Sequence, residues 1–194
     1  MSVEPIAPDG ELLAVQLDAY RVEAALIGSS VIPALRDTLD SLVAAGLSWS
    51  GVRDGAGLLG AVGIAVRADA VDIDRLVVAP RAFRRGVGTA LVRHVLAHAD
   101  RDVTVSTGQA NTPARALYER CGFAVERHME VEPGLWVTDY RRLLRRGAPL
   151  GGARERALGE RARTDPGDGI RGRAADHQTH RLEQRQHREL GPQQ

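Results

Sequence analysis

Two arginines and two glycines stand between a predicted strand and a predicted helix, in the stretch Phe-Arg-Arg-Gly-Val-Gly-Thr at 83–89. A helix N-terminus leaves about four backbone N–H groups without intrahelical partners and carries roughly half a positive charge. Glycine lets an anion approach the backbone closely, and arginine adds planar donors. This turn therefore predicts a site for a diphosphate. A P-loop is excluded because the chain has no lysine, and a dinucleotide fingerprint because Leu91 takes the place of its third small residue.

The elements that must position this turn are predicted from apolar periodicity and turn residues. Short turns predict antiparallel hairpins between the early strands, and a helix between two strands predicts one parallel crossover, so the sheet is mixed in an α/β or α+β domain. Thr112 is the expected N-cap of the last helix, with Gly122 at its C-terminal end. The expected helices are 11–27, 33–45, 87–99 and 113–121, and the expected strands are 47–53, 58–67, 70–79, 103–107, 123–132 and 135–144.

Composition limits the class of protein. Of the 194 residues, 43% are hydrophobic, which suffices for a core, and the net charge of +1 favours neither nucleic acid nor membrane as partner. One cysteine, Cys121, excludes an intramolecular disulfide and suits a reducing cytosol, so we expect a cytoplasmic protein. The segment 147–194 has no aromatic residue and only scattered large apolar ones, which predicts a disordered tail after a domain at 1–146.

Two segments in fixed order carry a family pattern. The first is Leu76-Val77-Val78-Ala79-Pro80 followed by Arg84-Arg85-Gly86-Val87-Gly88-Thr89-Ala90-Leu91. The second is Asn111-Thr112-Pro113-Ala114 continuing into Leu117-Tyr118-Glu119-Arg120-Cys121-Gly122-Phe123. Together they resemble the GNAT superfamily of acyl-CoA-dependent N-acyltransferases. The resemblance implies a mixed, mostly antiparallel sheet of six to seven strands flanked by about four helices.

The resemblance also implies how acetyl-CoA, the co-substrate, is held. Backbone groups of Val77 and Val78 would meet the pantetheine amides, and Asn111 would contact the cofactor from a later loop. The diphosphate would lie on the backbone amides of the turn, contributed by Arg84, Arg85, Gly86, Val87, Gly88 and Thr89. Phe83 departs from the family, which usually has Gln or Arg there; Arg81 or Arg84 is expected to compensate.

Catalytic roles follow from the same resemblance. Tyr118 would protonate the leaving CoA thiolate, and a backbone N–H at Val77 or Val78 would stabilise the oxyanion. Asp72 matches a strand position where some members carry a glutamate base, and Asp74 lies two residues on, on the same side of a regular strand. Either carboxylate can instead be a structural partner of Arg75. Weaker candidates for binding the acceptor are Glu130 and Glu132 on the late strand. Three further carboxylates on or near the first two helices could line a site for a cationic acceptor: Glu23, Asp37 and Asp40. The alternative for these three is that they belong to solvated helix faces.

We therefore expect an N-acetyltransferase that moves acetyl from acetyl-CoA to a primary amine of a small molecule or protein in a ternary complex. An acyl-CoA-binding regulatory module without turnover is the alternative, and a tail that binds nucleic acid or protein is a third reading. No metal is expected, because His94 and His98 have helical spacing but no third ligand nearby in the sequence. A homodimer is compatible with the sequence, which does not identify the acceptor.

Overall fold

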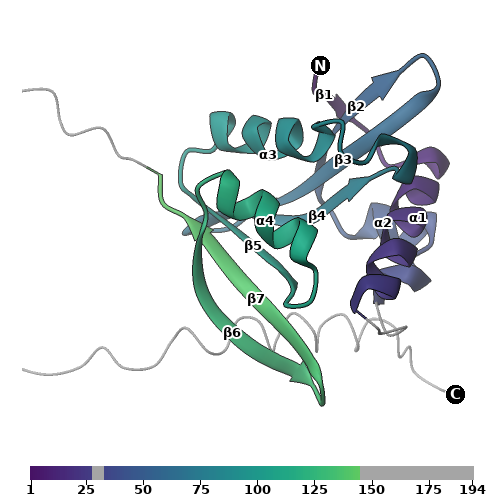
Figure 1. Cartoon of the computed structure of the whole chain (residues 1–194). Coiled ribbons are helices and arrows are strands. Elements are labelled where there is room, and N and C mark those ends of the chain that lie inside the picture. Colours follow the sequence, from purple (N-terminus) through teal and green to yellow (C-terminus); the bar gives the residue numbers. More distant parts are fainter. Residues whose placement is uncertain (28–32, 145–194) are drawn as a thin grey trace, which may run out of the picture. The chain divides into compact units, whose positions relative to one another are not determined.

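The structure is a computed structural model that describes residues 1–27 and 33–144 (Figure 1). The predicted tail at 147–194 and its boundary with the domain lie outside these residues. No helix in the described part is long and apolar enough to cross a bilayer. The elements, in chain order, are β1 (Glu4–Ile6), α1 (Gly10–Ile27), the 3-10 helix η1 (Pro33–Arg36), α2 (Leu39–Ala44), β2 (Ser48–Asp54), β3 (Gly57–Val66), β4 (Ala70–Val78), the 3-10 helix η2 (Pro80–Ala82), α3 (Val87–His98), β5 (Asp102–Gly108), α4 (Thr112–Arg120), β6 (Ala124–Glu132) and β7 (Leu135–Arg142).

One seven-stranded sheet organises the described residues, in the order β1-β2-β3-β4-β5-β7-β6. The β4–β5 pair is parallel and the other neighbouring pairs are antiparallel. The mixed, mostly antiparallel sheet predicted from the sequence is therefore confirmed. The short strand β1 was not predicted, because three residues are too few for an alternating pattern to be recognised.

Two predicted helix boundaries are wrong. The helix expected over 33–45 is divided into η1 and α2, because Thr38 forms a capping box with Ser41 and starts a new helix there. The N-cap of α4 is Asn111 and not Thr112: the Asn111 Oδ1 accepts a hydrogen bond from the Ala114 amide at 3.2 Å. In both cases a side chain that bonds the backbone ahead of it decides where the helix begins.

Two clusters of buried side chains cover the two faces of the sheet. One cluster joins α3, α4 and the strands, with Leu91, Val92 and Tyr118 among its members. The other joins α1 and α2 to the opposite face, with Leu12 and Leu42 at its centre. Helices on both faces thus hold the middle strands β3 and β4 in place, and β4 carries Val77 and Val78, two of the predicted cofactor residues.

Candidate active site

The two central strands diverge along their length. The parallel ladder joins Ala70–Ile73 of β4 to Asp102–Val105 of β5 and ends there. Beyond it, β4 stays paired with β3 as far as Val78, while β5 stays paired with β7 as far as Gly108. The β4 edge at Val77 and Val78 is therefore not used by β5. Both residues predicted to meet pantetheine lie on this diverging half.

A β-bulge interrupts β4 where the strands part. Gly63 pairs with Arg75 and Ile64 pairs with Ile73, so Asp74 is an extra residue opposite β3. We expected Asp72 and Asp74 to share a face because side chains two residues apart do so in a regular strand. The bulge interrupts this alternation, so the expectation no longer follows. Both carboxylates make named contacts: Asp72, 2% exposed, accepts a hydrogen bond from Thr104 Oγ1 at 2.8 Å, and Asp74 accepts one from Arg75 at 2.9 Å.

Arg75 lies at the centre of a buried polar cluster. Only 7% of it is exposed, and it donates to Asp37 at 3.1 Å as well as to Asp74. Gln16 of α1 donates to the same Asp37 oxygen at 2.7 Å. Burial works to lower the pKa of Arg75, but the Tyr20 phenol and the two carboxylates outweigh it and leave that pKa raised. The cluster ties the segment between η1 and α2 to the bulge, so Arg75 is here a structural partner of the acidic residues.

The turn from η2 to α3 has the backbone of an anion site. Arg84 and Gly86 both have positive φ, at 63° and 82°, and Gly86 is the N-cap without a side-chain capping bond. The amide of Ala90 donates to the Gly86 carbonyl, so the amides of Val87, Gly88 and Thr89 precede the first amide that has an acceptor within the helix. A Cβ at Gly86 would meet no heavy atom within 4 Å. The amides and this open space suit a diphosphate.

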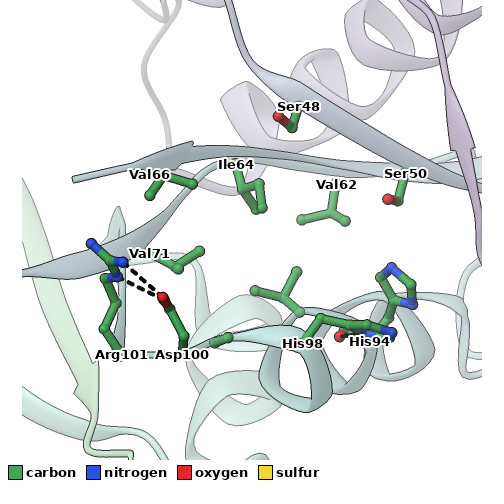
Figure 2. Close-up of a pocket in the computed structure, with 12 residues that line it drawn as sticks. Ser48, Ser50, Val62, Ile64, Val66, Val71, His94, His98, Asp100 and Arg101 are labelled. Atoms are coloured by element: carbon green, nitrogen blue, oxygen red, sulfur yellow. Dashed lines mark hydrogen bonds and ion pairs between the residues drawn. The ribbon is translucent and has the colours of Figure 1, made fainter. Parts of the chain in front are cut away.

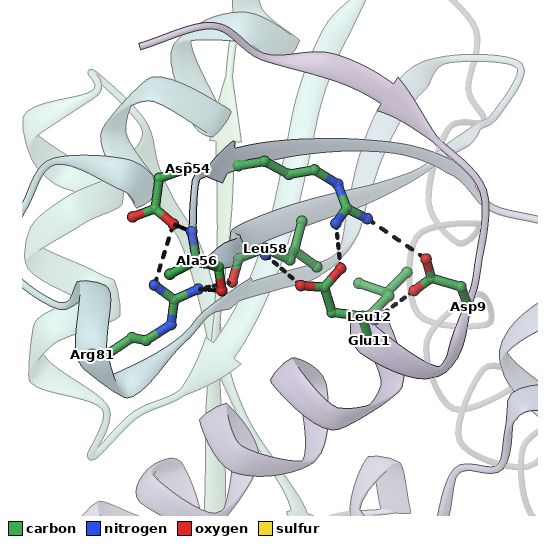
Figure 3. Close-up of polar contacts among 8 residues, drawn as sticks. Asp9, Glu11, Leu12, Asp54, Ala56, Leu58 and Arg81 are labelled. Carbon is green, nitrogen blue, oxygen red and sulfur yellow. Dashed lines mark hydrogen bonds and ion pairs between the residues drawn. The ribbon is translucent and has the colours of Figure 1, made fainter.

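The arginines of the turn divide into two kinds. Arg81 holds η2 on the β2–β3 turn by donating to the carbonyls of Ala56 and Leu58 at 3.2 and 3.1 Å and by pairing with Asp54 (Figure 3). Arg84 is exposed and makes no ion pair with a described residue, whereas Arg85 approaches Asp54 only at 3.8 Å. Of the two residues expected to compensate for Phe83, Arg81 is thus occupied by the fold and Arg84 is available to an anion.

Glu11 supports the same β2–β3 turn from α1. It accepts a hydrogen bond from the Leu58 amide at 2.6 Å and pairs with Arg53, and Asp9 accepts one from the Leu12 amide at the start of the helix (Figure 3). The bond from the Leu58 amide and then the bond from Arg53 lower the pKa of Glu11. These contacts fix the hairpin to which η2 is attached.

Tyr118 is the predicted acid, and α4 buries it at 4% exposure. Its ring contacts those of Phe123 and Tyr140, with centroids 5.7 and 5.9 Å apart. Burial raises the pKa of Tyr118 far above its usual value, and the charge of Glu23 adds to the rise. The phenol is therefore neutral, and the raised pKa makes it a weaker proton donor than a solvent-exposed tyrosine.

Asn111 and Glu23 connect α4 to α1. The Asn111 side chain caps α4 and lies near the Glu23 carboxylate of α1. Burial raises the pKa of Glu23, and the neighbouring Asn111 amide offsets part of the rise. The sequence marked Glu23 only as a carboxylate on a helix, because its partner is far away along the chain. The role of Asn111 towards the cofactor stays a prediction.

The remaining predicted acidic residues lie apart from this cluster. Glu130 is exposed on β6 and accepts a hydrogen bond from the Gly134 amide at 2.7 Å in the β6–β7 turn. Glu132 is exposed at the end of the same strand. Asp40 is exposed in the first turn of α2. Among the described residues, none of these three makes a hydrogen bond or ion pair with Tyr118 or with the amides of the α3 turn.

A separate pocket of about 230 Å³ lies between α3 and the strands, lined in part by Ser48, Ser50, His94 and His98 (Figure 2). The two imidazole rings are 4.4 Å apart, and His98 Nδ1 donates to the His94 carbonyl at 2.7 Å. No predicted site residue lines this pocket. Within residues 1–27 and 33–144, no group of three or more His, Cys, Asp and Glu side chains is placed to hold a metal ion.

A mixed sheet whose central parallel strands diverge next to an uncapped helix N-terminus defines the GNAT class of acyltransferases. The family model described as "Acetyltransferase (GNAT) family" matches residues 22–123, and the chain belongs to this family. That match contains the diverging strands, the α3 turn and α4, which are the elements on which the predicted site depends.

Solved structures share this fold at low sequence identity. The ribosomal-protein-S18-alanine N-acetyltransferase of Escherichia coli superposes with a TM-score of 0.61 at 13% identity, covering 78% of this chain and 99% of that one. The yncA protein of Salmonella typhimurium, solved with its cofactor acetyl-CoA, gives 0.59 at 16% identity, covering 78% and 98%.

One curated relative is similar in sequence. The UPF0157 protein YqkA of Bacillus subtilis is 35% identical over 130 residues, which make up 66% of this chain and 38% of the relative. This chain therefore spans well under half of that relative's length.

Proposed function

We propose that this protein is an N-acetyltransferase that transfers the acetyl group of acetyl-CoA to a primary amine by direct attack in a ternary complex. One observation carries the proposal: β4 and β5 part after Ile73 and Val105, and β4 leads through η2 to the uncapped N-terminus of α3. A long, narrow cofactor with a diphosphate needs both features in this order.

The chain's own groups would hold the cofactor along this path. The backbone of Val77 and Val78 would bond the pantetheine arm, because β5 does not use that edge of β4. The amides of Val87, Gly88 and Thr89 would receive the diphosphate, with Arg84 and Arg85 exposed beside them. Acetyl-CoA supplies the activated acetyl thioester.

Tyr118, which α4 places in the buried cluster, would donate the proton that the departing thiolate needs. Asp72 and Asp74 were predicted as bases. Their hydrogen bonds with Thr104 and Arg75 favour a structural role at the bulge over that role.

The cofactor site is tested by thermal unfolding of the full chain with acetyl-CoA. A ligand at 100 times its dissociation constant should stabilise the fold by about 2.7 kcal/mol. Thr89→Glu is the decisive variant, since a glutamate in the first turn of a helix favours the macrodipole but repels a diphosphate. We expect the apo melting temperature to hold and the acetyl-CoA shift to disappear. Thr89→Gln, of the same size and neutral, should keep the shift.

Two results would contradict the cofactor assignment. One is an unmodified chain that unfolds cooperatively at a melting temperature that acetyl-CoA does not change. The other is a Thr89→Glu variant that binds as well as Thr89→Gln.

A second candidate is an acyl-CoA-binding module without turnover. Phe83, 41% exposed where the family usually has Gln or Arg, favours it. Acetyl-CoA binding without amine-dependent release of CoA thiol, over a panel of primary amines, would support this alternative.

A further inference from the structure

We propose that Arg75 is a positioning residue for the pantetheine arm of acetyl-CoA. It fastens Asp74, the extra residue of the β4 bulge, to Asp37 in the segment between η1 and α2, and so fixes the register of the last residues of β4. The inference rests on the proposed function, because it concerns the strand edge that would bind the arm. It separates the binding of the arm from the binding of the nucleotide half of the cofactor.

The bulge changes which side chains of β4 face each layer of helices. Before the bulge, Val71 and Ile73 belong to the cluster that packs with α3 and α4. After it, Val78 packs against that cluster, whereas Val77 lies in the cluster of α1 and α2. Side chains of a regular strand alternate without interruption, so the one extra residue has exchanged the odd and even positions between the two faces. The bulge therefore decides which way every later residue of β4 points.

The same extra residue sets the direction of the backbone groups at the end of β4. The Ala79 amide donates to the Leu59 carbonyl of β3 at 2.8 Å. Residues of an antiparallel pair alternate between those that bond the partner strand and those that do not, so Val78 directs its N–H and C=O to the edge that β5 has left. Of the two residues predicted to meet the arm, Val78 is thus the one whose backbone faces the opening. A shift of the register by one residue would turn these groups towards β3.

Arg75 follows the extra residue directly and holds it from a buried position. Its side chain is 7% exposed, and its guanidinium donates to Asp74 Oδ1 at 2.9 Å and to Asp37 Oδ2 at 3.1 Å. Neighbouring side chains of a regular strand point to opposite faces, so a bond between Asp74 and Arg75 suits the bulged conformation. The fully buried Gln16 of α1 donates to the same Asp37 oxygen at 2.7 Å, which connects a second helix to the bulge.

Loss of this connection would affect the two halves of the cofactor differently. Without the guanidinium, the segment between η1 and α2 no longer holds the bulge, and β4 can exchange between registers. Val78 would then present its backbone groups to the arm only part of the time. The α3 turn is attached by other contacts, since Arg81 bonds the Ala56 carbonyl and pairs with Asp54. The site expected for the diphosphate should therefore be unchanged.

The experiment compares two ligands by titration calorimetry of the full chain. CoA carries the pantetheine arm, and 3′-phospho-ADP is its nucleotide half without the arm. We expect Arg75→Met to weaken the binding of CoA by about tenfold, which corresponds to one or two lost hydrogen bonds. The affinity for 3′-phospho-ADP should change by less than about twofold, because the arm makes no part of that complex. Arg75→Lys keeps the positive charge and should restore part of the affinity for CoA.

Leu42→Ala is the control for a general loss of stability. Leu42 is 1% exposed on α2 and packs in the apolar cluster on the same face as Val77. Its truncation should lower the melting temperature but leave the ratio of the two affinities unchanged. If Arg75→Met does not unfold cooperatively, Asp37→Asn takes its place, since it keeps a hydrogen-bond acceptor and removes the charge that Arg75 pairs with.

The ratio of the two affinities decides the outcome. A variant that weakens both ligands equally, or neither, overturns the role of Arg75 while the proposed function stands. An unmodified chain that does not bind CoA would overturn the proposed function and this inference with it.

Discussion

Gly60 is where the structure predicts the sharpest effect of a single methyl group. A Cβ built at Gly60 of β3 would lie 2.7 Å from the Val77 carbonyl oxygen, 2.9 Å from Val87 Cγ1 and 3.3 Å from the Val78 Cα. The first distance is about 0.7 Å shorter than 3.4 Å, the shortest distance of an ordinary van der Waals contact. Two of the three neighbours are backbone atoms of β4, so rotation of a side chain does not relieve the clash.

The magnitude follows from packing. Overpacking a well-filled interior costs about 1–3 kcal/mol, and a clash with backbone belongs at the upper end. We expect Gly60→Ala to lose about 2–3 kcal/mol. At roughly 3 °C per kcal/mol, the melting temperature should fall by about 6–9 °C. Because the displaced atoms belong to Val77 and Val78, the affinity for acetyl-CoA should fall as well.

Gly55→Ala is the matched control in the same hairpin. A Cβ at Gly55 meets nothing within 4 Å, and its φ lies outside the left-handed region. Alanine there should leave the free energy of unfolding unchanged or raise it by up to about 1 kcal/mol, because it lowers the conformational entropy of the unfolded chain. Both variants are measured by urea unfolding at equilibrium, with equal m-values as the check on two-state behaviour. A Gly60→Ala variant as stable as Gly55→Ala would refute the argument from close approach.

Three further predictions concern charge and protonation. Arg75→Met should cost about 3–5 kcal/mol in urea unfolding, because it removes the buried guanidinium that pairs with Asp37 and Asp74, whereas Arg53→Met, at an exposed pair, should cost less than about 1 kcal/mol. Equal losses of stability in Arg75→Met and Arg53→Met would contradict the idea that burial makes the Arg75 pairs matter more. Tyr118→Phe should keep the fold and the binding of acetyl-CoA but lower kcat by about 100-fold in thiol-release assays, and an unchanged rate would remove Tyr118 from the mechanism. Because the pKa of Glu23 is raised in the folded state, the ionised carboxylate destabilises the fold as pH rises through that pKa. The melting temperature of Glu23→Gln should therefore be higher than that of the unmodified chain at pH 8 and equal to it at pH 4. The reverse order would contradict burial of the charge.

The local sequence was enough to predict most of the elements in their order and the turn before α3. Periodicity marks α1, α3 and the strands β2 to β7, since alternation and helical spacing are local properties of the chain. The predicted parallel crossover between β4 and β5 is confirmed, because a strand, a helix and a second strand allow few connections. The spacing of the glycines around residue 87 likewise indicates an uncapped helix N-terminus before any coordinate is known.

Which polar side chains meet depends on how the elements pack together. The bulge at Asp74 depends on the pairing of β4 with β3 and removes the regular alternation from which the two aspartates were placed on one face. Arg81 is committed to the β2–β3 turn, and Gln16 to Asp37, by partners that lie far away in the chain. Hydrogen bonds of this kind form when elements pack together, and their partners leave no periodic signal in the sequence. The physical reason is that local preferences select the elements, whereas burial and pairing across the sheet select the contacts between them.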